Sequence, residues 1–312
     1  MNSTTKKTTI GGQALIEGIM MLGPTQCAVA VRRPDGEIEC KVEDANSLKT
    51  RYPFCALPLI RGVVGLYESM KRGISALNYS ASFLPEDEEG EPGRLDAWLE
   101  KTFGWERVQR VLTVIATTLG VLLPLFLFIF LPTLLAGTLD RYIGSGIWRN
   151  LLEGALRIAI FLLFMWSISH MKDMKRTFSY HGAEHKTIFC YEAGEELTVE
   201  NVRKFKKEHP RCGTSFLFSV MIISILVFSV VQWSNPFIRM ALRLALLPVV
   251  VAISYELNRL IGRYDNAVTR FLRAPGLWFQ GFTTFEPDDG MLEVAIKALE
   301  QVIPENEQED RW

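Results

Sequence analysis

The segment YHGAEHKTIFCYEAG, residues 180–194, places two histidines and a glutamate within five residues. Positions four apart lie on one face of a helix, so His181 and His185 can present two imidazoles to one cation. Glu184 lies beside them. Glu192 continues the same face, either as a third ligand or as a group that orients one of the histidines. The segment therefore predicts a metal-binding helix.

A second pair of ligands follows in HPRCGTSF, where His209 and Cys212 have the two-residue separation usual in metal knuckles. Two histidines from a helix with a histidine and a cysteine from a turn would bind zinc as a closed, structural site. If only three of these groups bind, a coordination position remains for water, whose pKa falls from ~15.7 towards ~7 on zinc. The spacing is compatible with both alternatives.

The pattern His-x-x-Glu-His is that of the inverted zincins, in which the histidines bind zinc and the glutamate is the general base. It assigns the base role to Glu184. The competing interpretation is structural. Gly182 in a helix costs ~1 kcal/mol relative to alanine, and Cys212 can be a small buried thiol. His170 is interpreted as an interfacial residue and not as a ligand.

Long apolar runs surround this segment. Residues 108–139 contain no charged residue except Arg110, and further runs cover residues 158–168, 216–233 and 244–253. A bilayer-spanning helix needs ~20 mostly apolar residues. The second and fourth runs reach that length only with their flanks, whose charges we expect to snorkel to the interface. Those charges include Glu153, Arg157, Arg239 and Arg243. We expect four transmembrane helices, the first of them kinked by Pro124 and Pro132.

Basic residues set the expected orientation. They gather before the first run, beyond the fourth and, above all, between the second and third runs. This bias places both termini and the central loop in the cytosol, and an even number of spans satisfies it. All five cysteines then fall on the reducing side, where disulfides are not expected. Acids and bases nearly cancel over the chain, so no specific DNA binding is expected.

The segments outside the runs predict a small cytosolic α+β layer. CAVAVRRPDGEIECKVE reads as a β-hairpin that turns at Pro34, Asp35 and Gly36. Residues 57–83 read as an amphipathic helix that lies on the membrane or packs on the spans. A final helix, capped by Asp288 or Asp289, needs a partner surface. Before it, a polar turn is interpreted as a solvated loop; it contains Arg273, Gln280, Thr283, Thr284 and Glu286.

The expected fold is thus an integral membrane, mainly α protein with four transmembrane helices and this α+β layer. Its parts are an N-terminal hairpin and helix, an acidic linker, a membrane domain whose cytosolic loop carries the histidines and cysteine, and a C-terminal loop and helix. Their expected ranges are 10–84, 85–107, 108–262 with the loop at 172–212, and 263–303.

Four motifs together resemble the YqhQ family of bacterial multi-pass membrane proteins, a group of unknown function described as predicted metal-dependent enzymes. The motifs are GGQALIEGIMMLGP, YHGAEHKTIFCYEAGEELTVENV, HPRCGTSF and PGLWFQGFTTFEPDDGMLEVAI. The resemblance covers residues 11–299. It implies a bacterial cytoplasmic-membrane location, and it implies that the N-terminal, central and C-terminal motifs belong to one unit on a shared cytosolic face.

Two functions follow as hypotheses. The first is a zinc-dependent hydrolase at the cytosolic membrane face, acting on a peptide or lipid-derived substrate, with Glu184 as base. The second is a non-enzymatic factor in membrane-protein biogenesis, or an adaptor. Its basic face would contact a translocon, a ribosome or a membrane protease, and its histidine cluster would hold a structural metal or only hydrogen bonds.

Overall fold

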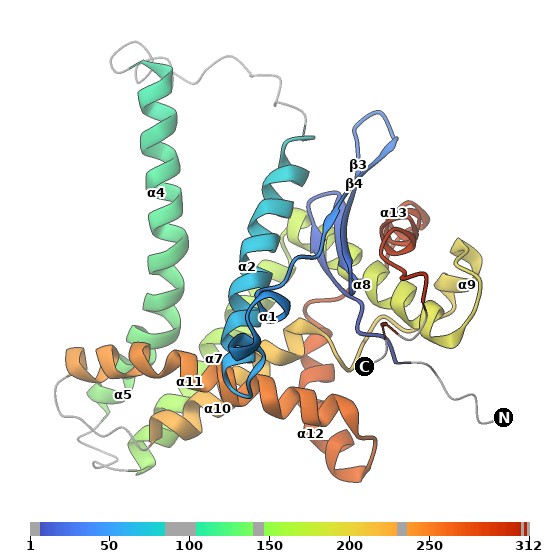
Figure 1. Cartoon of the computed structure of the whole chain (residues 1–312). Helices are drawn as coiled ribbons and strands as arrows, with labels where there is room; N and C mark the ends of the chain where they lie inside the picture. Colours follow the sequence, from blue (N-terminus) through green and yellow to red (C-terminus); the bar gives the residue numbers. More distant parts are fainter. Residues whose placement is uncertain (1–6, 85–103, 140–146, 230–235, 307–308, 311–312) are drawn as a thin grey trace. The chain divides into compact units, whose positions relative to one another are not determined.

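Figure 1 shows the computed structural model of the chain, which describes residues 7–84, 104–139, 147–229, 236–306 and 309–310. The chain forms two compact units. Unit 1 comprises Met1–Leu84, Met165–Val227 and Ala245–Trp312, and unit 2 comprises Pro85–Phe164 and Phe228–Leu244. Segments from the N-terminal, central and C-terminal parts of the chain therefore fold together in unit 1. Most of the expected acidic linker lies outside the described residues.

A four-stranded antiparallel sheet in the order β1-β2-β3-β4 opens unit 1. Its strands are β1 Gly11–Leu15, β2 Gly18–Leu22, β3 Gln26–Arg32 and β4 Ile38–Asp44. The predicted hairpin is the pair β3 and β4, which turns at Gly36 with φ 90°. The pair β1 and β2 was not predicted. Its turn lacks the glycine that usually signals a tight hairpin. Glu17 takes the left-handed conformation there, with φ 51°.

Strands β2 and β3 are covered on both faces, because side chains alternate along a strand and each set packs on different helices. One face packs Ile19, Met21 and Ala30 against helices α8 and α13. The opposite face packs Met20 and Val31 against helix α2. The bounds of these helices are α2 Ile60–Ala81, α8 Lys172–Ala193 and α13 Asp289–Glu300. The expected N-terminal amphipathic helix is α2, and it packs on helix α11 where Gly62 meets Tyr255.

Helix α8 is the centre of unit 1. Every residue from 179 to 188 is buried although many are polar. It ends at Gly194, whose φ of 71° provides the left-handed C-cap that glycine adopts without strain. The shorter helices around it are α1 Leu48–Arg51, η1 Pro53–Ala56 and α9 Val199–Arg203. The predicted cap of the final helix is confirmed at Asp288, which accepts a hydrogen bond from the backbone of α13, and Thr198 caps α9 in the same way.

Helix α12, Ala267–Gln280, stands where a loop was predicted from residue 273 onwards. That expectation was wrong. Pro275 and Gly276 lie inside the helix and disfavour it locally. A capping box of Asn266 and Thr269 begins the helix, and tertiary packing of Gly276 against Ser215 holds its second half.

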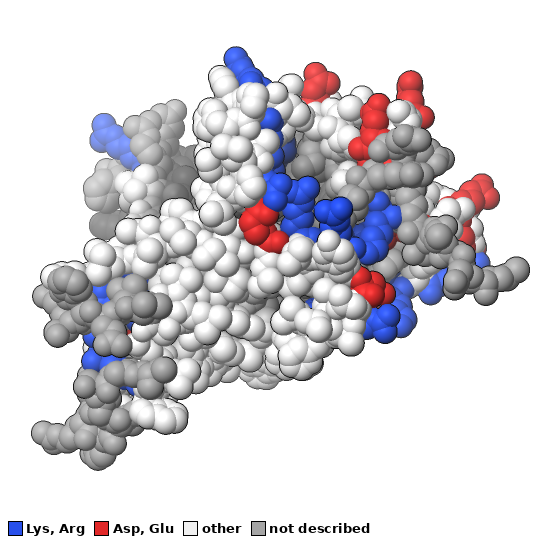
Figure 2. All heavy atoms as spheres, turned by 60° about the horizontal axis from the view of Figure 1, so that its bottom comes forward, with Lys and Arg blue, Asp and Glu red and all other residues white. Residues whose placement is uncertain are grey.

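Among the described residues, three helical stretches are long and apolar enough to cross a membrane. They are Thr118–Thr138, Trp148–Ser169 and Phe237–Arg263. The remaining expected span coincides with α10, Gly213–Ser229, an apolar helix of 17 residues. On the face shown in Figure 2, broad areas carry no charged side chains, and lysine and arginine side chains gather beside them. Such helices and surfaces are compatible with a membrane protein.

The first apolar stretch is interrupted where its prolines predicted a distortion. Helix α4, Trp105–Leu125, contains Pro124, and α5, Leu131–Thr138, has Pro132 in its first turn. Between them, Phe126–Phe130 forms a π-helical turn, η2. Proline removes a backbone donor and clashes with the preceding turn, and a π turn accommodates that misfit within a continuous helix.

The charges expected to snorkel are instead buried within unit 2. Glu153 of α7, Ile147–Ser169, is 1% exposed, and Arg243 of α11, Pro236–Arg263, is 2% exposed. The two groups form an ion pair, and Thr133 of α5 donates a hydrogen bond to Glu153 over 2.8 Å. Arg157 pairs with the same carboxylate at 3.3 Å. In an apolar environment a charge needs such a partner, which explains why these side chains turn towards each other.

Gly182 tests the packing around α8. A Cβ atom at this position would lie 2.0 Å from the backbone oxygen of Phe285. Gly182→Ala should therefore lower stability by about 1–3 kcal/mol through overpacking, despite its ~1 kcal/mol gain in helix propensity. Thermal unfolding of the purified protein followed by circular dichroism measures this. Gly120→Ala in α4 is the control, because nothing lies within 4 Å of its new Cβ. Equal melting temperatures for Gly182→Ala and the parent would contradict the assigned contact.

Candidate metal centre

Helix α8 presents His181 and His185 on one face, with ring centroids 4.4 Å apart. Cys212, in the turn that precedes α10, brings its sulfur within 3.1 Å of His181 Nε2. Ligand atoms of these three residues all lie within 4.8 Å of one another, and each residue is buried at this position. The described part of the chain thus contains a buried group of two histidines and a cysteine that could hold a metal ion.

Backbone carbonyls orient both imidazoles. The Nδ1–H of His181 donates to the carbonyl of Thr283 over 2.8 Å, and the Nδ1–H of His185 donates to the carbonyl of Lys207. A carbonyl oxygen can only accept, so each ring carries its proton on Nδ1 in these contacts. Each ring therefore keeps Nε2 for a ligand. Metal-binding histidines in proteins are generally held in this way.

Two orphaned buried atoms support a fit to a cation. Within the described residues, His185 Nε2 and Glu184 Oε2 have no hydrogen-bond partner. Buried polar atoms are nearly always paired, and these two belong to neighbouring residues of one helix turn. Imidazole nitrogen and cysteine sulfur are suited to a transition metal such as zinc. The donor set and the unpaired atoms therefore fit a metal ion.

The electrostatics of the site favour a thiolate. Burial alone opposes ionisation of Cys212, but the neighbouring imidazoles of His181 and His185 hold the pKa of its thiol well below the usual range. Burial also opposes a charged His181, yet the adjacent sulfur raises the pKa of His181 to about 9. The proton shared by this pair is the one that a metal ion would displace, since thiolate and neutral imidazole are the ligating forms.

Glu184 lies next to the group but is not part of it. Strand β1 covers it, and the Gly12 N–H donates to Glu184 Oε1 over 3.0 Å. A Cβ at position 12 would lie 2.9 Å from the Glu184 carboxyl carbon, so only glycine allows this approach. Burial raises the pKa of Glu184. One of its oxygens is thus fixed by the backbone, and the other is left unpaired.

The structure does not bring His209 into the ligand group. Its Nδ1 accepts a hydrogen bond from the Arg211 backbone over 3.4 Å, and its Nε2 lies 3.7 Å from Glu192 Oε2. Burial lowers its pKa to about 4. The ring centroid is 5.5 Å from that of His185. His209 therefore packs behind His185, with its Nε2 towards Glu192 but without a hydrogen-bond partner among the described residues.

Glu192, expected as a third ligand or an orienting group, likewise lies outside the ligand group. It accepts a hydrogen bond from the Thr8 N–H over 2.7 Å and pairs with Arg211. Burial alone would raise its pKa, but the neighbouring His209 and the charge of Arg211 lower it. Glu192 thus ties the N-terminal segment and the turn that carries Cys212 to the end of α8.

The interpretation of the polar turn after α12 as a solvated loop was wrong for its central residues. Gln280, Thr283 and Thr284 are at most 1% exposed. The Gln280 side chain accepts from the His209 N–H and donates to the His209 carbonyl, both over 2.8 Å. Thr283 supplies the carbonyl that orients His181. The available signal was the interleaving of these polar residues with Phe279, Phe282 and Phe285, which is unusual for a solvated turn.

Two further charged residues hold segments against α8. Glu17, in the turn between β1 and β2, pairs with Arg176 and accepts a hydrogen bond from the Tyr180 hydroxyl over 3.2 Å. Lys186 is 4% exposed, pairs with Glu286 and donates to a backbone carbonyl of α9. Lys186 is one of the basic residues between the second and third apolar runs, but the protein encloses its charge.

The fold and site describe a mainly helical protein with long apolar helices and a buried histidine and cysteine group. Residues 57–305 match the family described as "Protein of unknown function (DUF1385)", and the chain belongs to that family. It is 33% identical over 295 residues to the "Uncharacterized protein YqhQ" of Bacillus subtilis strain 168, covering 94% of this chain and 92% of that protein. The resemblance to the YqhQ family is thereby confirmed. No solved structure matches the chain.

Metal content distinguishes the ligands from their neighbours. We expect His185→Ala and Cys212→Ser to lose most of the bound metal, because each removes one of three ligand atoms. His209→Gln should retain it, because His209 is not among the three residues whose ligand atoms converge. Inductively coupled plasma mass spectrometry of the purified variants measures the metal-to-protein ratio. A parent protein without stoichiometric metal, or a His185→Ala variant that keeps it all, would contradict the assignment.

Glu192→Ala tests the second group of contacts. The change leaves the Arg211 guanidinium, whose side chain is 8% exposed, without its carboxylate. Removing one partner of a buried ion pair costs about 3–5 kcal/mol, so a clear fall in the free energy of unfolding is expected. Chemical denaturation measures it. Glu195→Ala, at an exposed position just beyond α8, is the control and should stay within about 0.5 kcal/mol of the parent.

Proposed function

We propose that this protein is a zinc-dependent hydrolase of the bacterial cytoplasmic membrane, with its site at the cytosolic face. The observation that carries the proposal is the convergence of His181, His185 and Cys212, with the unpaired carboxylate oxygen of Glu184 beside them. Three protein ligands with one remaining coordination position are typical of catalytic zinc sites, whereas structural sites usually have four. This supports the three-ligand alternative.

The residues around the group would have separate roles in a hydrolytic site. Zinc, when bound, would supply a Lewis acid that activates water at neutral pH. Glu184 would accept the proton of that water, because its Oε1 is held by the Gly12 N–H and its Oε2 is left unpaired. The raised pKa of the buried carboxyl brings it closer to the working range of a general base. Thr283 and the Lys207 carbonyl keep the imidazoles in their ligating orientation.

The proposed location follows from the apolar helices and the basic residues. Three helical stretches of the described residues have the length and composition to cross a bilayer, and α10 would serve as a fourth, short span. The basic residues of the connection between α7 and α10 favour the cytosol for that connection and for both termini. A peptide or lipid-derived substrate would suit a site close to the bilayer surface.

Glu184→Gln tests the base role. It keeps an acceptor for the Gly12 N–H but cannot take up a proton, so we expect the metal content to be unchanged and turnover to fall about 10²–10⁴-fold. Hydrolysis of fluorogenic peptide and lipid-ester substrates by the zinc-loaded protein measures the activity. Glu195→Gln is the matched control at an exposed site. Full activity in a folded, metal-bound Glu184→Gln protein would refute this role.

The burial of the site favours a second candidate function. His185 is 1% exposed, and a group this enclosed can serve to hold the turn around Cys212 in place. The protein would then be a biogenesis factor or adaptor for a translocon, ribosome or membrane protease. Four exposed apolar residues on α2 offer a contact surface: Tyr67, Met70, Ile74 and Leu77. Stable co-purification with such a partner, together with normal cellular function of Glu184→Gln, would support this candidate against the hydrolase.

A further inference from the structure

Helix α12 exposes an unusually apolar face. The exposed fraction is 77% for Phe271, 66% for Val268 and 57% for Trp278, and Leu272 is exposed as well. These positions follow a helical spacing on one side of α12. The adjoining side of the helix is buried, where Thr269, Gly276 and Phe279 pack on the protein. An apolar face of this kind on a short helix requires a partner outside the chain's own core.

The position of α12 indicates what that partner is. Its first residue, Ala267, follows the end of the apolar helix α11 at Arg263 after only three residues. Near its other end, a Cβ on Gly276 would lie 2.9 Å from Ser215, in the first turn of α10. Phe279 stacks on Phe218 of the same helix, with centroids 5.9 Å apart. Helix α12 therefore follows the C-terminal end of α11 in the chain and packs on the N-terminal part of α10.

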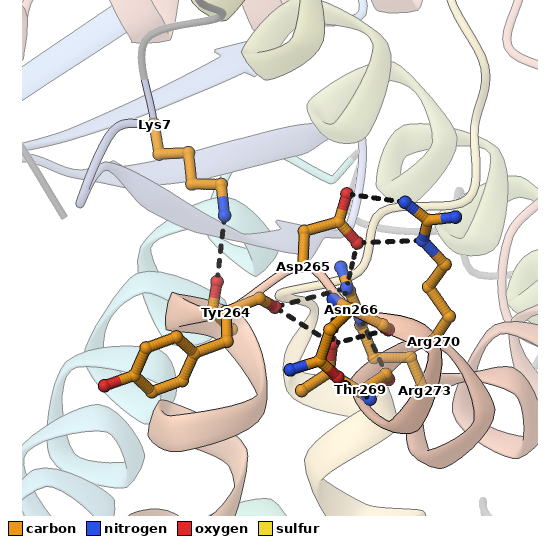
Figure 3. Close-up of polar contacts among 8 residues, drawn as sticks. Lys7, Tyr264, Asp265, Asn266, Thr269, Arg270 and Arg273 are labelled. Carbon is orange, nitrogen blue, oxygen red and sulfur yellow. Dashed lines mark hydrogen bonds and ion pairs between the residues drawn. The ribbon is translucent and has the colours of Figure 1, made fainter.

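The junction between α11 and α12 is held by a polar network, shown in Figure 3. Asp265 pairs with Arg273 at 2.7 Å and with Arg270 at 3.2 Å. Asn266 and Thr269 exchange the two hydrogen bonds of the capping box. Lys7 donates to the carbonyl of Gly262 in the last turn of α11. These contacts fix the direction in which α12 leaves α11, so its exposed face is a stable feature of the fold.

We propose that α12 lies along the cytosolic surface of the bilayer, with Val268, Phe271, Leu272 and Trp278 inserted at the boundary between headgroups and acyl chains. If α10 and α11 both cross the membrane, a helix that joins two of their ends on one side must run along that side. The residues at the junction suit this depth, because Tyr264 and Arg263 are both exposed there and such side chains favour the membrane interface.

The inference rests on the proposed membrane location and not on the proposed reaction. It has a consequence for the metal centre, because Gln280 ends α12 and Thr283 follows three residues later. These residues hold His209 and orient His181. The metal centre would therefore be attached to a lipid-inserted helix through Gln280 and Thr283, and it would lie close to the level of the headgroups. An amphiphilic substrate that partitions into the interface suits a centre at that depth.

Fluorescence quenching of Trp278 tests the insertion. The full chain is reconstituted into vesicles of phosphatidylcholine and phosphatidylglycerol, with and without brominated acyl chains, and the emission of Trp278→Phe is subtracted from that of the parent. We expect the Trp278 emission to lose about half its intensity to brominated lipid, since interfacial helices reach ~5–10 Å into the boundary region. It should resist quenching by acrylamide in the aqueous phase.

A tryptophan in the cytosolic layer provides the control. Glu300→Trp, placed at an exposed position of α13 in the Trp278→Phe background, should be quenched by acrylamide and not by brominated lipid. If Trp278 behaves like this control, it faces water and the inference is overturned. Protection from both quenchers would also overturn it, because a protein contact, such as a second copy of the chain, would then cover α12. Metal content of the same samples is read separately, so a failure here is distinguishable from a failure of the hydrolase proposal.

Discussion

The fold of unit 1 depends on the burial of a polar helix. Helix α8 carries two imidazoles, a carboxylate and a lysine ammonium group into a region where water is excluded, and a buried polar atom without a partner is costly. Three distant segments supply the partners. Strand β1 brings a backbone N–H to Glu184, and the turn after α9 brings the Lys207 carbonyl to His185. The turn after α12 brings the Thr283 carbonyl to His181.

This requirement explains why two glycines lie where they do. Gly12 and Gly182 are the points at which backbone approaches α8 so closely that a Cβ would collide with it or with its partner. A side chain at either of these two positions would keep the sheet or the C-terminal turn too far from α8 to form hydrogen bonds with it. The metal group, the sheet and the final helix are thus parts of one packing arrangement, and the cysteine turn joins it through Glu192 and Arg211.

In unit 2, buried charges also need partners, although here they lie among apolar helices. Glu153 and Arg243 lie on two apolar helices and face each other, which gives each buried charge a partner. Phe228 packs between the guanidinium groups of Arg157 and Arg243, at 5.3 and 5.6 Å from its ring centroid. Charges near the ends of apolar segments can reach the interface or pair inside the protein. The choice between these outcomes depends on neighbouring helices and not on local sequence.

The sequence by itself determined the elements whose signals are local. Apolar length predicted the long helices, the turn at Gly36 predicted one hairpin, and the spacing of His181 and His185 predicted a shared helix face. Features that depend on distant partners were decided only by the tertiary structure. Examples are the β1 and β2 pair, which turns at the non-glycine Glu17, and α12, which persists through Pro275 because it packs on α10. A third example is that Cys212 meets the histidine pair and His209 does not. Both are close enough in the chain to reach one cation. Contacts with Gln280 and Glu192 hold His209 away from the histidine pair, whereas Cys212 lies against His181.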